Sequence, residues 1–111
     1  MKKLIAILMV LTMALSFAAC SGAASDVHRL VMVTGGDAGT YYAFGGVIAN
    51  VINAKDVGVE INVQSTGASK ANIYLVHDGE ADLAIVQNDV MDYGYNGTDL
   101  FAAEGKADGF R

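Results

Sequence analysis

Small hydroxyl and amide side chains are concentrated in three short loops, each of which directly follows an apolar run. Residues 34–40 read TGGDAGT, residues 65–69 read STGAS, and residues 87–89 read QND. A segment with helical periodicity follows each loop, so each loop predicts a helix N-terminus with unpaired backbone amides. Such amides, at the positive end of a helix dipole, favour carboxylate or phosphate groups. These residues therefore predict a binding site for a small anion.

Several side chains in or beside the loops could contribute to such a site. Gln87 and Asn88 could donate to a carboxylate, and Asp89 could accept from an ammonium group. Tyr41 and Tyr42 offer apolar ring faces with hydroxyl tips, and one of the two is expected to pack in the core. Hydroxyl groups come from Thr40, Ser65, Thr66 and Ser69.

Some of these residues also have simpler explanations. Thr40, Ser69 and Asp89 are each expected to act as helix N-caps, whatever else they do. Asp37 is expected to form the turn of its loop rather than to contact a ligand. The same residues therefore fit both a binding role and a structural one.

The elements that must position these loops are strands and helices in alternation. Residues 30–33 and 83–86 are uninterrupted apolar runs, typical of strands covered on both faces. Residues 59–64 alternate apolar and polar, which predicts a half-exposed strand near an edge. Right-handed crossovers then favour the parallel order 2-1-3, which brings all three loops to one edge of an α/β sheet.

The helices between the strands are also readable. After Thr40, an i, i+3, i+4, i+7, i+8 stripe predicts a packed helix. Gly45 and Gly46 each weaken that helix by roughly 1 kcal/mol, and we expect both to allow a close approach to the sheet or a ligand. A short helix over residues 69–78 is expected to end at Gly79, and a third, beginning at Asp89, near Gly97. The stripe of the first helix is formed by Phe44, Val47, Ile48, Val51 and Ile52.

The beginning of the chain resembles an export signal. Lys2 and Lys3 precede a mostly apolar run over residues 4–15, which is typical of a secretory leader rather than of a membrane-spanning helix. Cys20 follows Ala18 and Ala19, an arrangement that resembles a bacterial lipobox, in which the thiol is lipidated after cleavage. We therefore expect a signal peptide over residues 1–19, a lipid-anchored tether over residues 20–26, and an extracytoplasmic location. The alternative is ordinary signal cleavage near Ala24.

Composition excludes several function classes. Loss of the leader removes two lysines and no acid, so a formal charge of −5 becomes −7, which disfavours nucleic acid and anionic lipid. No cysteine other than Cys20 exists to form a disulfide. His28 and His77 are far from the loops and from each other, so the sequence predicts neither a nucleophile with its base nor a metal site. We expect a non-enzymatic protein without a cofactor.

Three motifs in order resemble one family. TGGDAGTYY with the following Gly45-Gly46 helix, STGASKAN over residues 65–72, and HDGEADLAIVQND over residues 77–89 are similar to segments of the TAXI-type solute receptors of tripartite ATP-independent periplasmic (TRAP) transporters. The resemblance spans roughly residues 30–101. This sequence differs from the family pattern at two positions. The family often has Pro at the position of Ala43 and a second Gly at the position of Ala68.

The resemblance implies a binding protein that captures a small carboxylate or amino-acid solute, such as glutamate or 2-oxoglutarate. It would deliver this solute to an ion-driven membrane permease. Residues 27–111 would be the N-terminal part of a solute-binding domain, namely an incomplete first lobe of a type II periplasmic-binding-protein-like fold. By similarity, the ligand contacts would be Gly39, Thr40, Tyr41, Tyr42, Ser65, Thr66, Ser69, Asn72 and Gln87.

Two alternatives remain open. The same cleft would serve an exported lipoprotein that senses a ligand and presents it to a membrane partner without transport. A chain holding only part of the cleft could also bind nothing. The tail, residues 99–111, is polar and interrupted by glycine, and predicts no closing strand or helix. Lys70, the one basic side chain near the loops, is expected to point to solvent.

Overall fold

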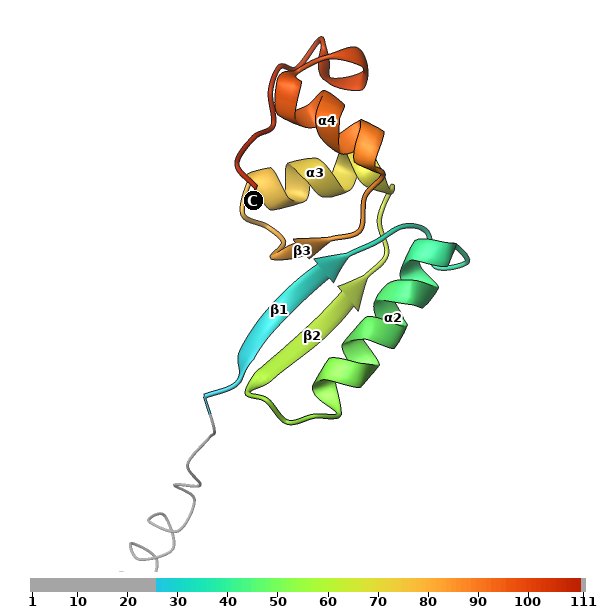
Figure 1. The fold of residues 1–111 in the computed structure, drawn as a ribbon, viewed down its shortest axis with the longest axis vertical. Helices are drawn as coiled ribbons and strands as arrows, with labels where there is room; N and C mark the ends of the chain where they lie inside the picture. The colour runs from blue at the N-terminus through green and yellow to red at the C-terminus, as the bar shows by residue number, and fades with distance from the viewer. Residues whose placement is uncertain (1–25, 111) are drawn as a thin grey trace, which may run out of the picture.

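The computed structural model of the protein describes residues 26–110. Three parallel strands form one open sheet in the order β2-β1-β3, flanked by helices (Figure 1). This confirms the predicted α/β class and strand order, and it is consistent with a fragment of a periplasmic-binding-protein-like lobe. The predicted signal peptide and Cys20 lie outside the described residues. The elements are β1 (His28–Val33), α2 (Thr40–Asn53), β2 (Val59–Gln64), α3 (Ser69–His77), β3 (Leu83–Ala84), α4 (Asn88–Asn96) and the 3-10 turn η2 (Asp99–Phe101).

The two edges of the sheet differ in length. β2 pairs with the whole of β1, and its alternating burial confirms the predicted half-exposed edge strand. β3 pairs only with the last two residues of β1. The prediction of a buried strand over residues 83–86 is therefore wrong in extent and burial, because Leu83 is exposed and Ala84 is half-buried. Pairing begins where the Asp82 carboxylate accepts the Val31 N–H (2.8 Å), and Ile85 donates the last bond to Val33 (3.0 Å) before the chain turns towards α4.

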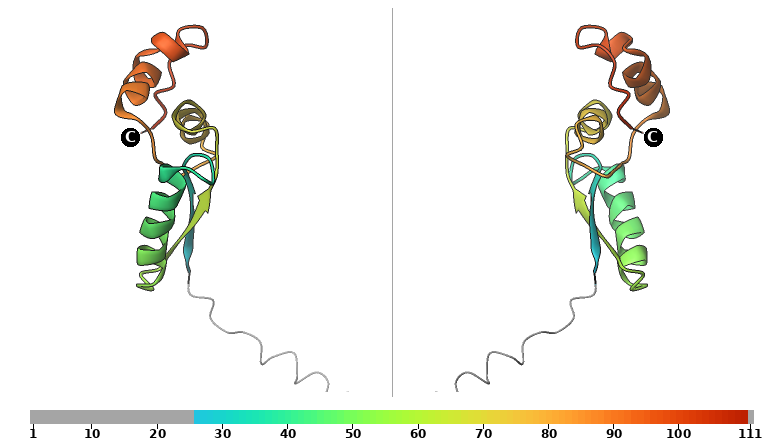
Figure 2. Two further views of the ribbon diagram at one scale, coloured as in Figure 1. Left: turned by 90° about the vertical axis from the view of Figure 1, so that its right-hand side faces the viewer. Right: turned by 90° about the vertical axis from the view of Figure 1, so that its left-hand side faces the viewer.

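One core lies between the sheet and α2, which occupies the opposite side of the sheet from α3 (Figure 2). Its buried members are Met32, Ala49 and Ile61. The predicted stripe is only partly correct. Ile48 and Ile52 pack against this core, whereas the other three members are more than half exposed. Those three are Phe44 (58%), Val47 (59%) and Val51 (53%).

The orientation of α2 about its own axis is set by its smallest residues, which face the sheet. Gly45 and Ala49 are the buried residues of α2 and, with Ile48 and Ile52, form an i, i+3, i+4, i+7 face of their own. A Cβ at Gly45 would lie 2.7 Å from Thr34 Cγ2, so the close approach expected there is confirmed. A Cβ at Gly46 would meet nothing within 4 Å, so the expected close approach to the sheet does not occur at Gly46.

β1 is covered on both faces only at its C-terminal end. Met32 and Val33 are buried, whereas Leu30 and Val31 are half-buried and the first two residues are exposed. The prediction of a strand covered throughout is therefore too broad. α3 lies beside the end of the sheet that carries β3, so it does not extend over the start of β1 (Figure 1).

A second core joins α3, α4 and the tail. Its buried members are Ile73, Val90, Phe101 and Ala107, and Phe101 and Ala107 are fully buried. The tail thus packs closely through a 3-10 turn, although, as predicted, its described residues form no closing strand or α-helix. Gly94 makes this possible, because a Cβ there would lie 3.0 Å from Ile73 Cγ2 and 3.3 Å from Phe101 Cζ.

Candidate functional site

The three predicted loops meet at the C-terminal edge of the sheet, beside the N-termini of α2, α3 and α4 (Figure 1). The first two loops are joined by a hydrogen bond from the Thr66 N–H to the Gly35 carbonyl (3.1 Å). The last two are joined by a bond from the Gln87 N–H to Ser69 Oγ (2.9 Å). The sequence therefore placed the loops correctly, and the structure adds the bonds that hold them together.

Asn72 is the centre of this assembly. Its side chain is fully buried, and its amide nitrogen donates both to the Thr34 carbonyl and to the Ile85 carbonyl (2.9 Å). Its amide oxygen accepts from Thr66 Oγ1 (2.5 Å). One side chain on α3 thus links the ends of β1 and β3 to the second loop, and its hydrogen-bonding groups are used inside the protein.

Ser69 and Thr66 are also engaged in these bonds. Ser69 is buried and accepts from Gln87, while Thr66 is half-buried and accepts from the Ala68 N–H (3.2 Å). Of the nine predicted ligand contacts, Ser69, Thr66 and Asn72 therefore have a visible structural role in fixing the loops. Their contact with a ligand remains a prediction.

The other six predicted contacts are accessible at this edge. Thr40, Ser65 and Gln87 are exposed, and Gly39, Tyr41 and Tyr42 are half-buried. Tyr41 packs over the first loop, since a Cβ at Gly35 would lie 3.5 Å from Tyr41 Cβ.

The N-cap predictions are wrong at all three helices. The N-cap residues are Gly39, Ala68 and Gln87, and none of them makes a side-chain cap hydrogen bond. Thr40 and Ser69 are instead the first residues of their helices, and the Asp89 carboxylate accepts only from Val90, the next residue (2.9 Å). In α2 the fourth amide, Ala43, donates to the Gly39 carbonyl (3.2 Å). The first-turn amides of α2 and α3 are therefore open to an external acceptor, whereas in α4 the Val90 amide is already bonded to Asp89.

Charge distinguishes the three helix ends. The first turns of α2 and α3 carry no acidic residue, whereas α4 has Asp89 in its first turn, which offsets the positive end of that dipole. An anion is therefore best accommodated between α2 and α3. Lys70, the second residue of α3, does not simply extend into solvent as expected. It forms an ion pair with Glu104 (3.0 Å) and lies 5.5 Å from the Phe101 ring centroid.

The ion pair affects Glu104. The hydrogen bond from Lys70 lowers the pKa of the Glu104 carboxyl below its ordinary value, and burial opposes this only in part. Both side chains are partly exposed, so the pair is a surface contact between α3 and the tail.

Ala68 has an unusual backbone conformation in the second loop, with φ +69° and ψ −155°. This region is occupied almost only by glycine. The family that the sequence resembles often has glycine at this position, and the φ value supplies the physical reason. The conformation turns the chain from β2 into α3.

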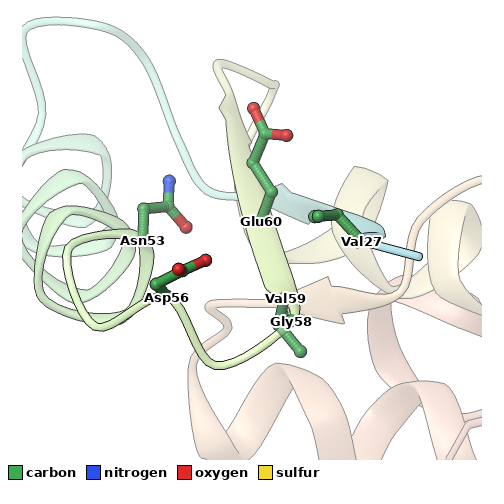
Figure 3. A pocket seen from close by; sticks show the side chains of 6 residues that line it. All are labelled: Val27, Asn53, Asp56, Gly58, Val59 and Glu60. Atoms are coloured by element: carbon green, nitrogen blue, oxygen red, sulfur yellow. The ribbon is translucent and has the colours of Figure 1, made fainter. Parts of the chain in front are cut away.

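Two cavities lie away from the loops. One, of about 300 Å³, is formed at the opposite edge of the sheet by the end of α2, the turn that follows it and the starts of β1 and β2 (Figure 3). Asn53 lies in its wall and pairs with both backbone groups of Ile61 (2.8 and 3.0 Å), so its amide protects the outer edge of β2. The carboxylates in the wall of this cavity are those of Asp56 and Glu60, and Glu60 forms an ion pair with Arg29 (3.0 Å).

The second cavity, of about 200 Å³, lies beside β3 and is mainly apolar. Its wall includes Ile73 and Val76 of α3, Met91 of α4 and Phe110 of the tail, with Asp82 as its acidic member. No predicted ligand contact lines either cavity. Sequence reasoning did not identify them, because their walls combine side chains from distant segments without a common motif.

Residues 26–110 also bear on metal binding and on membrane insertion. No group of three or more His, Cys, Asp or Glu side chains there is arranged to hold a metal ion. Within the same residues, no helix has the length and apolar character needed to cross a membrane.

Comparison with known protein families places most of the chain in one of them. A family model described as the NMT1-like family matches residues 32–111, which is well over half of the chain. The matched region contains all three loops and the helices that follow them. This family is related to periplasmic solute-binding proteins.

Proposed function

Because this chain belongs to the NMT1-like family, we propose that it is the extracytoplasmic solute-binding component of a TRAP transporter of the TAXI type. Family membership supports a solute-binding role at a coarse level. The three sequence motifs that resemble TAXI receptors support the finer assignment. The proposed solute is a small carboxylate such as glutamate or 2-oxoglutarate, and the proposed partner is the membrane permease.

The observation that carries this proposal is the pair of uncapped helix N-termini at α2 and α3. Neither has a side-chain cap or an acid in its first turn, and both lie where parallel α/β sheets bind ligands. Backbone amides there can bind a carboxylate without a basic side chain. The bonds made by Asn72 and Thr66 hold the second loop against the first, so the amides are positioned before a ligand arrives.

The remaining parts of the proposal concern location and chemistry. We propose export through the leader and lipid anchoring at Cys20, which would keep the protein near its permease. We assign it no catalytic step. Among the described residues, neither histidine is hydrogen-bonded to a loop hydroxyl, and the hydroxyls of Ser69 and Thr66 are used in structural bonds.

Calorimetric titration with glutamate, 2-oxoglutarate and neutral glutamine tests this function. We expect an acid to bind and the neutral amide to bind more weakly. Thr40→Pro removes one open amide and suits a first helical position, because Gly39 has the extended conformation (φ −93°, ψ 157°) that precedes proline. A hydrogen bond to a charged group contributes about 1.5–3 kcal/mol, so affinity should fall roughly 10- to 150-fold.

Thr40→Val is the matched control, because it removes the hydroxyl and keeps the amide. It should reduce affinity less than Thr40→Pro. Equal affinity of folded Thr40→Pro and unmodified protein would refute the amide site. Failure of the folded protein to bind any of the acids would refute the carboxylate assignment and favour a ligand-sensing lipoprotein for another solute.

A further inference from the structure

Residues 108–110 of the tail lie across the C-terminal end of α3. The Gly109 N–H donates to His77 Nδ1 (2.8 Å), and the Phe110 ring forms part of the wall of the apolar cavity beside β3. Phe110 also packs edge-on against Tyr95, with ring centroids 6.4 Å apart. Three residues before Phe110, the fully buried Ala107 donates to the Gly94 carbonyl (2.8 Å). Residues 108–110 thus form a short strap between a fixed point at Ala107 and the contact with His77.

The bond to His77 defines the protonation state of the imidazole. A backbone N–H can only donate, so Nδ1 must carry a lone pair, and the proton of the neutral ring is on Nε2. An imidazolium ion donates from both nitrogens and cannot accept this bond. The contact leaves little room for adjustment, because a Cβ at Gly109 would lie 2.8 Å from Nδ1 and 2.9 Å from the His77 carbonyl oxygen.

Acidic residues lie close to His77 and Gly109 in the sequence. His77 is in the last turn of α3, where the helix dipole favours a cation, and Asp78 follows it directly. On the tail, Asp108 precedes Gly109, and Glu80 and Asp82 lie in the connection between α3 and β3. No carboxylate within residues 26–110 forms an ion pair with His77 that would fix the ring. The Gly109 bond is therefore the contact of the ring that protonation would break.

We propose that His77 and Gly109 form a pH-sensitive latch. With His77 neutral, the latch holds residues 108–110 across the apolar cavity; protonation breaks the bond, releases Phe110 and opens the cavity on the β3 side. Histidine side chains change charge between pH 5 and 8, so the latch responds within a physiological range. The latch does not depend on the solute-binding proposal, because no loop residue takes part in it.

The test is an NMR titration of the ¹⁵N-labelled protein from pH 8.5 to 5. The Gly109 amide signal should move with the same midpoint as the His77 ring signals, and its exchange protection, corrected for intrinsic rates, should fall at least tenfold. The contact between the Tyr95 and Phe110 rings should be lost over the same range. The Ala107 amide is the internal control, since its acceptor is a carbonyl that does not titrate.

Three variants make the test specific. His77→Gln should abolish the transition near neutral pH, whereas His28→Gln, at the start of β1, should leave it unchanged. Asp108→Asn should retain it, which separates the imidazole from the neighbouring carboxylate. A Gly109 amide that keeps its position and protection while the His77 ring titrates would overturn the latch. So would a Gly109 transition of unchanged midpoint in His77→Gln.

Discussion

Adding one methyl group should stabilise the protein at Gly46 in α2 but not at the adjacent Gly45. Glycine inside a helix costs about 1 kcal/mol relative to alanine. A Cβ at Gly46 meets nothing within 4 Å, so Gly46→Ala should gain most of this amount. A Cβ at Gly45 would lie 2.7 Å from Thr34 Cγ2 and 3.4 Å from Met32 Sδ, so Gly45→Ala must displace its neighbours.

Thr34 cannot move easily to relieve that contact. It is fully buried, and its hydroxyl donates to the Gln64 carbonyl (2.8 Å). Overpacking a core by one methyl group costs about 1–3 kcal/mol, which offsets or exceeds the gain in helix propensity. We therefore expect Gly45→Ala to be neutral or destabilised by up to about 2 kcal/mol, and to be less stable than Gly46→Ala by about 1–3 kcal/mol.

Urea unfolding followed by far-ultraviolet circular dichroism measures both effects. The midpoint should rise for Gly46→Ala and stay or fall for Gly45→Ala, with equal slopes in both. Because the Thr34 carbonyl accepts from Asn72 and Thr66, Gly45→Ala should also weaken ligand binding at the loops, whereas Gly46→Ala should not. Equal stabilisation of the two variants would refute the close contact between α2 and the sheet.

Two other perturbations follow from particular residues. Ala68→Gly should raise the free energy of unfolding by about 1 kcal/mol, because Ala68 has φ +69°. The control Ala71→Gly, inside α3, should lower it by about 1 kcal/mol. Melting temperatures of the two variants that shift in the same direction would contradict this. The Lys70–Glu104 pair should stabilise the fold at pH values above the ordinary pKa of glutamate. This stabilisation should be lost as the pH falls through the lowered pKa of Glu104. Unfolding measured against pH should show that loss in the unmodified protein and not in Glu104→Gln.

The order of the strands could be predicted because it depends on local patterns and on a general rule of handedness. Apolar runs located β1 and β3, the alternation over residues 59–64 located the edge strand, and right-handed crossovers fixed their order. The helix ends near Gly79 and Gly97 could also be predicted, because glycine commonly follows the last turn of a helix. Both glycines have the positive φ that this position requires. The same reasoning brought the three loops to one edge.

Helix packing could not be predicted from periodicity. α2 carries two apolar faces, one with Phe44 and Val47 and the other with Gly45 and Ala49. Hydrophobicity favours the first face, but the second packs against the sheet because small side chains allow backbones to approach closely. Which face of α2 packs on the sheet depends on how well the two surfaces fit in volume, and the sequence of the helix alone does not give the shape of the sheet surface.

The roles of the polar residues show the same division. The sequence by itself determined that hydroxyl and amide side chains gather at the carboxyl ends of parallel strands, because strand period, helix period and crossover handedness are local properties. Only the tertiary structure decided that Asn72 is buried as the link between loops, whereas Thr40 and Gln87 remain exposed. A buried polar group needs partners at hydrogen-bond distance, and those of Asn72 include Thr34, which is 38 residues away in the chain.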